Sequence, residues 1–244
     1  MSYKNITELR KSVLHCPRTE CPFRNTHKGH YPKPPRGPIT AEVMMIFENP
    51  GSPEGKNLKK EDNPECQWDI NTITLKEARQ LSIRGQTNWL FDTCRLDRNI
   101  WSKHNMVIGE TVYTTDTHKC PNPKGGKAKQ KKTAFRICIE YLQEEIRLVK
   151  PKVIFAFGDY ARRAVKHIEG VRWVDEKNGK ELIIKKSGAR QERLYHTDQR
   201  LYVLMPHPSG FWQNPPMTIT DYNEALEYAF AKASDWVNRP AKQL

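Results

Sequence analysis

The sequence predicts an α/β protein, a three-layer α/β/α sandwich around a central four-stranded parallel sheet. Four short apolar runs read as strands, and segments with the helical spacing of apolar residues lie between them. The runs are continuously apolar rather than alternating, which is typical of parallel strands that helices cover on both faces. The 244 residues are enough for one such domain, spanning 1–244.

The expected elements alternate along the chain. We expect strands over 42–47, 106–108 continuing through 111–115, 152–157 and 201–205. We expect helices over 5–14, 75–83, 87–96, 133–149, 159–168 and 219–237. Residues 17–39 and 52–72 read as loops, and 171–199 reads as a basic insertion that is irregular or folded as a hairpin.

The chain is strongly basic and polar. Lys and Arg number 41 against 28 Asp and Glu, a formal net charge of +13, and the mean hydropathy is −0.79. No apolar run is long enough to cross a bilayer and no signal peptide is readable, so we expect a cytoplasmic protein without a membrane partner. The charge suggests a polyanionic partner, most simply nucleic acid, although charge alone also fits a merely soluble basic protein.

Six cysteines are present: Cys16, Cys21, Cys66, Cys94, Cys120 and Cys138. In a cytoplasmic chain, metal ligands, catalytic groups or buried thiols are expected before disulfides. Prolines follow Cys16 and Cys21 and indicate a compact loop. No Cys-x-x-Cys pair occurs, so a zinc ribbon is poorly supported and the spacing alone leaves these alternatives open.

Polar residues follow each expected strand at the point where the strand ends. Residues 48–51 follow the first strand and Asp116 ends the second, while 158–159 follow the third and 207–210 follow the fourth. Parallel strands end at one edge of a sheet, where open α/β proteins place their chemistry. We therefore expect these residues to converge on one site.

Four motifs in these positions resemble the uracil-DNA glycosylase superfamily, and most closely its iron–sulfur members. The first is Phe47-Glu48-Asn49-Pro50-Gly51 and the last is His207-Pro208-Ser209. Between them, 113–120 resembles the segment that contains a ligand cysteine in the iron–sulfur enzymes. The stretches 138–142 and 150–161 resemble their helix, strand and Gly-x-x-Ala turn.

The resemblance implies a [4Fe–4S] cluster, for which four thiolates are the usual ligand set. The matching positions are Cys16, Cys21, Cys120 and Cys138. The chain departs from the family in the first spacing, with four residues between Cys16 and Cys21 where the family has two. Cys66 and Cys94 match no ligand position and are expected to be ordinary thiols.

The resemblance also implies a monofunctional DNA glycosylase, which hydrolyses the bond between a base and deoxyribose and leaves an abasic site. Asn49 takes the position of the water-orienting residue, and Glu48 beside it is expected to share that role. His207 is expected to donate a hydrogen bond to the base as negative charge builds there, unless it is only a structural histidine.

A base inside a duplex must be flipped out to reach such a site. Phe211 or Trp212 lies where the superfamily has its intercalating wedge, unless it packs against the sheet edge. Trp68 and Trp89 are candidates to stack on the base. Ser209 and the basic run of Lys124, Lys127 and Lys129 are expected to contact DNA.

Asp116 stands where the iron–sulfur uracil enzymes have a base-reading Asn. An ionised Asp only accepts hydrogen bonds, which suits the amino group of cytosine better than the O4 of uracil. Gly51 replaces a bulky Tyr and leaves the C5 edge of the base open. We therefore expect a C5-modified cytosine, as found in viral DNA, and hence a role in host defence, unless Asp116 only caps a turn.

Three alternatives remain open at this point. Instead of a glycosylase for a modified cytosine, the chain would be an ordinary uracil-DNA glycosylase of base excision repair, a non-catalytic protein that binds modified DNA, or an RNA or nucleotide hydrolase on the same fold. DNA is the expected partner, and the protein is expected to be a monomer.

Overall fold

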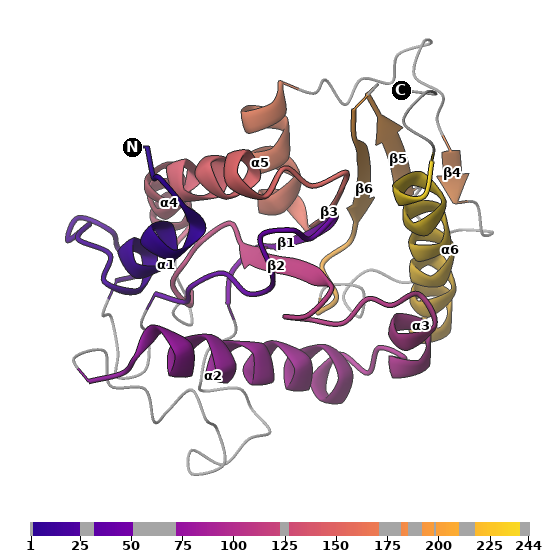
Figure 1. Cartoon of the computed structure of the whole chain (residues 1–244), viewed down its shortest axis with the longest axis horizontal. Coiled ribbons are helices and arrows are strands. Elements are labelled where there is room, and N and C mark those ends of the chain that lie inside the picture. Colours follow the sequence, from indigo (N-terminus) through magenta and orange to yellow (C-terminus); the bar gives the residue numbers. More distant parts are fainter. Residues whose placement is uncertain are drawn as a thin grey trace.

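The structure is a computed structural model that describes residues 2–24, 32–50, 72–122, 127–170, 182–184, 192–197, 199–209 and 218–239 (Figure 1). A central sheet runs through the molecule, and helices cover both of its faces. Within the described residues, no helix combines the length and the apolar character needed to span a membrane.

The sheet contains the four expected parallel strands. They are β1 (Val43–Phe47), β2 (Val112–Asp116), β3 (Val153–Phe157) and β6 (Leu201–Met205), in the spatial order β2-β1-β3-β6. Two further strands, β5 (Glu192–His196) and β4 (Leu182–Ile184), extend the sheet beyond β6 in antiparallel pairing. The segment 171–199 therefore contains a paired hairpin, which was one of the two forms expected for it.

Helices form the two outer layers. α1 (Ile6–Leu14), α4 (Ala128–Val149) and α5 (Asp159–Glu169) cover one face, and α3 (Arg98–Lys103) and α6 (Ile219–Val237) cover the other. α2 (Leu75–Asn88) continues directly into a π-helical turn, η2 (Trp89–Thr93). The turn η2 packs against the face of the sheet that α6 covers. The expected α/β/α sandwich is confirmed.

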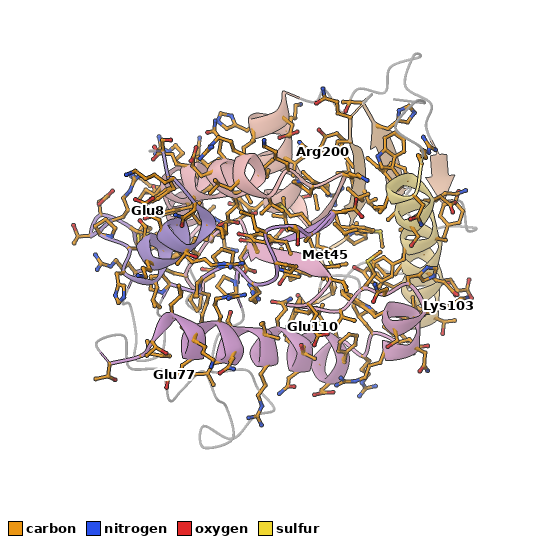
Figure 2. The ribbon with its side chains drawn as sticks, viewed as in Figure 1. Glu8, Met45, Glu77, Lys103, Glu110 and Arg200 are labelled. Carbon is orange, nitrogen blue, oxygen red and sulfur yellow. The ribbon has the colours of Figure 1, made fainter. Side chains whose placement is uncertain are left out.

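Alternation along each buried strand divides the core into two parts. Met44 and Ile46 of β1 pack under the α1, α4 and α5 layer, whereas Val43, Met45 and Phe47 pack under the α3 and α6 layer. Met45 lies near the middle of the molecule (Figure 2). Burying a large apolar side chain contributes about 1.5–3 kcal/mol to the stability of the fold. In a strand that is buried on both faces, the side chains of both faces make this contribution.

Three expected boundaries were wrong. The helices expected over 75–83 and 87–96 are one continuous run, because α2 passes through Gly85 and leads into η2. A mid-helix glycine costs only about 1 kcal/mol, which packing overrides here. α4 begins at 128 rather than 133, with Gln130 Oε1 accepting from the Lys127 N–H at 2.8 Å. The run 106–108 contributes only an isolated bridge at Ile108.

Candidate active site

The polar residues expected at the strand ends do lie along one edge of the sheet. Glu48 and Asn49 directly follow β1, Asp116 is the last residue of β2, Gly158 directly follows β3 and His207 lies two residues beyond β6. We call this side of the sheet the carboxyl edge. The parallel register of the four strands places all five positions there, although they are far apart in sequence.

Glu48 and Asn49 have different surroundings. Glu48 Oε1 accepts the backbone N–H of Tyr160, in the first turn of α5, at 3.3 Å. A helix N-terminus favours an anion, so this contact holds the carboxylate against α5. Asn49 Nδ2 donates to the Pro50 carbonyl at 3.1 Å, which leaves Oδ1 as the acceptor of this amide.

Gly158 makes the position of Glu48 possible. Its φ is +91°, and a Cβ there would lie 2.5 Å from Glu48 Oε1 and 2.8 Å from Glu48 Cγ. Any other residue would combine left-handed backbone strain with a clash against this carboxylate. Glycine at 158 therefore opens the space that Glu48 occupies.

The two ring nitrogens of His207 have different surroundings. Its Nδ1 lies 2.8 Å from Ser209 Oγ, and its Nε2 is enclosed with no hydrogen-bond partner within the described residues. Burial lowers the pKa of His207 to about 4, although the charge of Asp116 acts to raise it. When the Ser209 hydroxyl donates to Nδ1, the single proton of the neutral ring is on Nε2.

The pKa of His207 predicts an acid-sensitive fold. Its folded pKa of about 4 lies below the ordinary 6.5, so between these values the unfolded chain binds a proton that the folded chain does not. The neutral His207 ring contributes up to about 3 kcal/mol to the free energy of unfolding. This contribution is complete above pH 6.5 and is lost as the pH falls toward 4. Urea unfolding between pH 7 and 4 should show a shallower loss for His207→Gln than for the wild type; parallel curves would contradict the burial of this ring.

Two aromatic rings border His207. The Trp89 ring lies 5.3 Å from the His207 ring, centre to centre, and meets the Phe47 ring edge-on at 6.0 Å. Phe47 is fully buried and stacks on Phe157 at 4.7 Å, so its ring is already used in the core. Trp89 is only partly buried, so part of its side chain is accessible at this edge. π-helical turns such as η2 are frequent at functional sites.

Asp116 is fixed by a buried ion pair. Its Oδ2 accepts from Arg36 Nη2, and both side chains are 2% exposed. Arg36 Nη1 also donates to Gln86 Oε1 at 2.7 Å, which ties the pair to α2. The main chain of Arg36 pairs with Thr114 of β2 through two N–H···O bonds of 2.9 Å, anchoring the guanidinium beside the end of that strand.

His118, which follows β2, contacts the main chain that follows β1. His118 Nδ1 lies 2.8 Å from the Glu48 carbonyl oxygen, and its Nε2 lies 3.1 Å from the Lys131 carbonyl oxygen. Burial lowers the pKa of His118, although both backbone contacts act to raise it. This ring connects the turn after β1 to the first turns of α4.

The four cysteines of the resemblance are close enough to affect one another's pKa values. All four are buried, two in the loop after α1, Cys120 after β2 and Cys138 in α4. A hydrogen bond from Cys138 lowers the pKa of Cys21 to about 7, and burial raises that of Cys120, with further effects from Cys16 and Cys21. The Lys119 N–H lies 3.5 Å from Cys138 Sγ.

No group of three or more His, Cys, Asp or Glu side chains within the described residues is arranged to hold a metal ion. Cys94 packs in the core beneath α6, where burial raises its pKa to about 12. It is the ordinary buried thiol that the sequence predicts. Cys66 lies outside the described residues.

The described lysines of the basic run expected to contact DNA lie at the surface, unlike Lys119 just before them. Lys119 is buried, and its Nζ contacts Glu145 Oε1 at 2.7 Å and donates to the Asp116 carbonyl at 2.7 Å. Lys119, which precedes this run in the sequence, therefore belongs to the interior and not to a basic surface. Lys127 and Lys129 are exposed at the beginning of α4, where no acidic residue lies in the first turn.

Several expected site residues cannot be placed. Gly51, Trp68, Lys124, Phe211 and Trp212 lie outside the described residues. Ser209 is exposed, and its hydroxyl is engaged with His207. Sequence reasoning missed Arg36 and Gln86, since a charged residue in a proline-rich loop and a glutamine in a helix are ordinary features.

The three-layer fold, with polar side chains gathered at the carboxyl edge of its sheet, is that of a DNA glycosylase, a hydrolase of N-glycosidic bonds. A family model described as the Uracil DNA glycosylase superfamily matches residues 78–230, more than half of the chain, and the chain belongs to this superfamily. Over 205 residues the chain is 28% identical to a Pyrobaculum aerophilum protein named Type-5 uracil-DNA glycosylase, covering 80% of this chain and 81% of that protein.

Proposed function

We propose that this protein is a monofunctional DNA glycosylase that flips a cytosine-type base out of DNA and hydrolyses its N-glycosidic bond. One observation carries the proposal. An amide, a carboxylate and a histidine with an enclosed, unpaired Nε2 lie at strand ends along one edge of the sheet within the described residues. These are the groups needed to place a water, read a base and stabilise a leaving base.

The reaction needs a positioned water and stabilisation of a sugar with oxocarbenium character. The Oδ1 of Asn49 accepts a hydrogen bond from the attacking water and orients it, because Nδ2 is held by Pro50. The Glu48 carboxylate, held by α5, supplies negative charge near the cationic sugar. Asn49 is thus the water-orienting residue, and Glu48 assists through its charge.

The leaving base carries away the electrons of the broken bond. His207 stabilises this charge by donating from Nε2 to the base carbonyl O2, and Ser209 keeps the proton on that nitrogen. A neutral donor suits this step, because a pKa of about 4 keeps the ring uncharged at neutral pH. Trp89 stacks on the flipped base beside His207.

The DNA backbone contacts the end of α4 nearest the site. Lys127 and Lys129 are exposed at the N-terminus of this 22-residue helix, where basic side chains oppose the helix dipole. A bound DNA phosphate would explain why two lysines lie at this unfavourable position, because phosphates bind both lysines and helix N-termini. Phe211 or Trp212 supplies the wedge that fills the emptied stack.

A [4Fe–4S] cluster bound by Cys16, Cys21, Cys120 and Cys138 completes the proposal. The donor set fits, because four buried thiols from three separated segments influence one another and a backbone N–H lies beside one sulfur. A single ion needs its ligands at one point about 2.3 Å away, whereas a four-iron cluster takes one thiolate at each corner. The cluster would cross-link the loop after α1 to α4 and the end of β2.

The base is a C5-modified cytosine. Asp116 accepts from the amino group of the base, and Gly51 leaves room for the extra group. An enzyme that removed ordinary cytosine would damage its own genome, so the modification is required for release. Because such bases are a feature of viral DNA, the enzyme serves in host defence.

The test is base release from matched oligonucleotides containing uracil, cytosine, 5-hydroxymethylcytosine or glucosylated 5-hydroxymethylcytosine, followed by alkali to reveal abasic sites. Release confined to a modified cytosine is the expected result. Release of uracil alone would make the protein an ordinary uracil-DNA glycosylase of base excision repair, the activity in the name of the P. aerophilum relative. Binding without release from any oligonucleotide would favour a non-catalytic reader of modified DNA.

Gly158→Ala tests the role of Glu48, with Gly170→Ala as its matched control. Both glycines have positive φ, but a Cβ at Gly170 meets nothing within 4 Å, whereas one at Gly158 meets Glu48. Each substitution should cost about 1–2 kcal/mol of backbone strain by urea unfolding. Only Gly158→Ala should also slow base release, by up to about a hundredfold, because it displaces the carboxylate. Equal activity of the two variants would remove Glu48 from the reaction.

A further inference from the structure

The ion pair between Arg36 and Asp116 fixes the charge of the base-reading residue. A guanidinium stays protonated at any physiological pH, and one that is buried without a counter-charge is strongly destabilising. Asp116 is the acidic side chain that pairs with Arg36 within the described residues. Asp116 is therefore a carboxylate, and its second oxygen accepts hydrogen bonds and donates none.

The same contacts leave one acceptor and one donor unused. Asp116 Oδ1 and Gln86 Nε2 are both enclosed without a hydrogen-bond partner in the part of the chain that the structure describes. The orientation of the Gln86 amide is set, because Arg36 donates to its oxygen. Buried polar atoms in native proteins are nearly always paired, so this pair of atoms points to a ligand.

Both unused atoms belong to residues that are linked to the surroundings of His207. The charge of Asp116 acts on the His207 ring. Gln86 lies three residues before Trp89 in the continuous run of α2 and η2, and the Trp89 ring is 5.3 Å from that of His207. A base that contacts His207 is therefore close to both groups.

We infer that Arg36 and Gln86 determine the base specificity of this site, an inference that rests on the proposed glycosylase function. Arg36 is a positioning residue that holds Asp116 as an acceptor-only carboxylate and aims Oδ1 at an exocyclic amino group. Gln86 holds Arg36 and offers its amide N–H to the ring nitrogen beside that amino group. The ligand is a base with an amino donor next to a ring acceptor, the edge that cytosine presents.

Uracil is disfavoured by the same arrangement. Its single N3–H lies between two carbonyl oxygens, so a carboxylate that approaches the N–H also approaches two acceptors. The amino group of cytosine projects from the ring and has only one acceptor beside it, which Gln86 satisfies. The fixed charge on Asp116 therefore favours an amino base over a carbonyl base.

The test exchanges the ion pair for a neutral pair. Asp116→Asn alone leaves the Arg36 guanidinium buried without its partner, so its melting temperature should fall well below that of the double variant Arg36→Gln with Asp116→Asn. The probes are oligonucleotides carrying 2′-fluorinated 5-hydroxymethylcytidine or 2′-fluorinated uridine. The 2′-fluorine opposes positive charge at the sugar, so these bases bind without being released.

Wild type should bind the cytosine probe more tightly, and the double variant should shift the ratio of the two affinities toward uracil by about thirtyfold or more. Gln86→Leu should shift the same ratio by about tenfold, because one hydrogen bond to the base is lost. Removing the exposed pair Lys152–Glu42, at the opposite edge of the sheet, with Lys152→Gln and Glu42→Gln should leave the ratio unchanged.

A folded double variant whose affinity ratio lies within threefold of wild type would overturn the inference, as would an Asp116→Asn protein as stable as wild type. A purely structural ion pair would weaken binding of both probes equally and leave the ratio where it was. Wild type that prefers the cytosine probe but releases no base from hydrolysable DNA would refute the glycosylase and still support the inference.

Discussion

His207→Ala is expected to slow base release by about a hundred- to a thousandfold, because it removes the donor aimed at the departing base. The Nε2 of this residue is enclosed and unpaired within the described residues, and a Ser209 hydroxyl that donates to Nδ1 places the ring proton on Nε2. The donor is therefore already in place before the base arrives. A preorganised donor acts mainly on the transition state, so the loss should appear in kcat rather than in KM.

Single-turnover base release from the best oligonucleotide gives the measurement. His167→Ala, on the exposed face of α5, is the matched control and should retain wild-type activity. Ser209→Ala should reduce the rate of base release less. Without the hydroxyl, either ring nitrogen of His207 can bear the proton, but the ring itself remains. If His207→Ala released the base at the wild-type rate, His207 would be a structural residue of the strand end.

Cys138→Ser is expected to abolish iron and sulfide binding and to lower the melting temperature by about 10 °C or more. The binding free energy of a structural metal centre is part of the folding free energy, so its loss destabilises the whole fold. Cys138 lies in α4 and hydrogen-bonds to Cys21, so it joins a core helix to the loop after α1. Serine keeps the size of the side chain and removes the thiolate.

Anaerobically purified protein, assayed for iron, acid-labile sulfide and visible absorption, tests this prediction. Cys94→Ala is the control: this thiol is equally buried but lies in the core beneath α6. It should keep wild-type iron content. A wild-type preparation without iron or sulfide would refute the cluster, and four buried thiols would then contribute only packing.

Much of the fold is predictable from local pattern. The four parallel strands are continuous apolar runs, and burial on both faces allows few other interpretations. The strand ends then follow from the strands, so the placement of Asn49, Asp116 and His207 on one edge needs only the rule that parallel strands end together. Helix boundaries were less predictable, because packing carried α2 through Gly85 and α4 began a turn early.

The environment of each site residue was not predictable in this way. Lys119 looks like part of a basic surface run, yet it is buried against Glu145, which lies 26 positions away on α4. Glu48 looks like a free carboxylate, yet a glycine 110 positions later and the start of α5 hold it. Such pairings join segments that no local periodicity connects.

The sequence by itself determined the layered α/β fold, the edge of the sheet on which the site lies and the residue types at that edge. The fold and the edge follow from apolar patterns that extend over only a few neighbouring residues. Only the tertiary structure decided the partner of Asp116, because its counter-charge, Arg36, lies 80 positions away and both are buried together. Charge state depends on burial and on the nearest opposite charge, and both are set by the folded arrangement rather than by sequence neighbours.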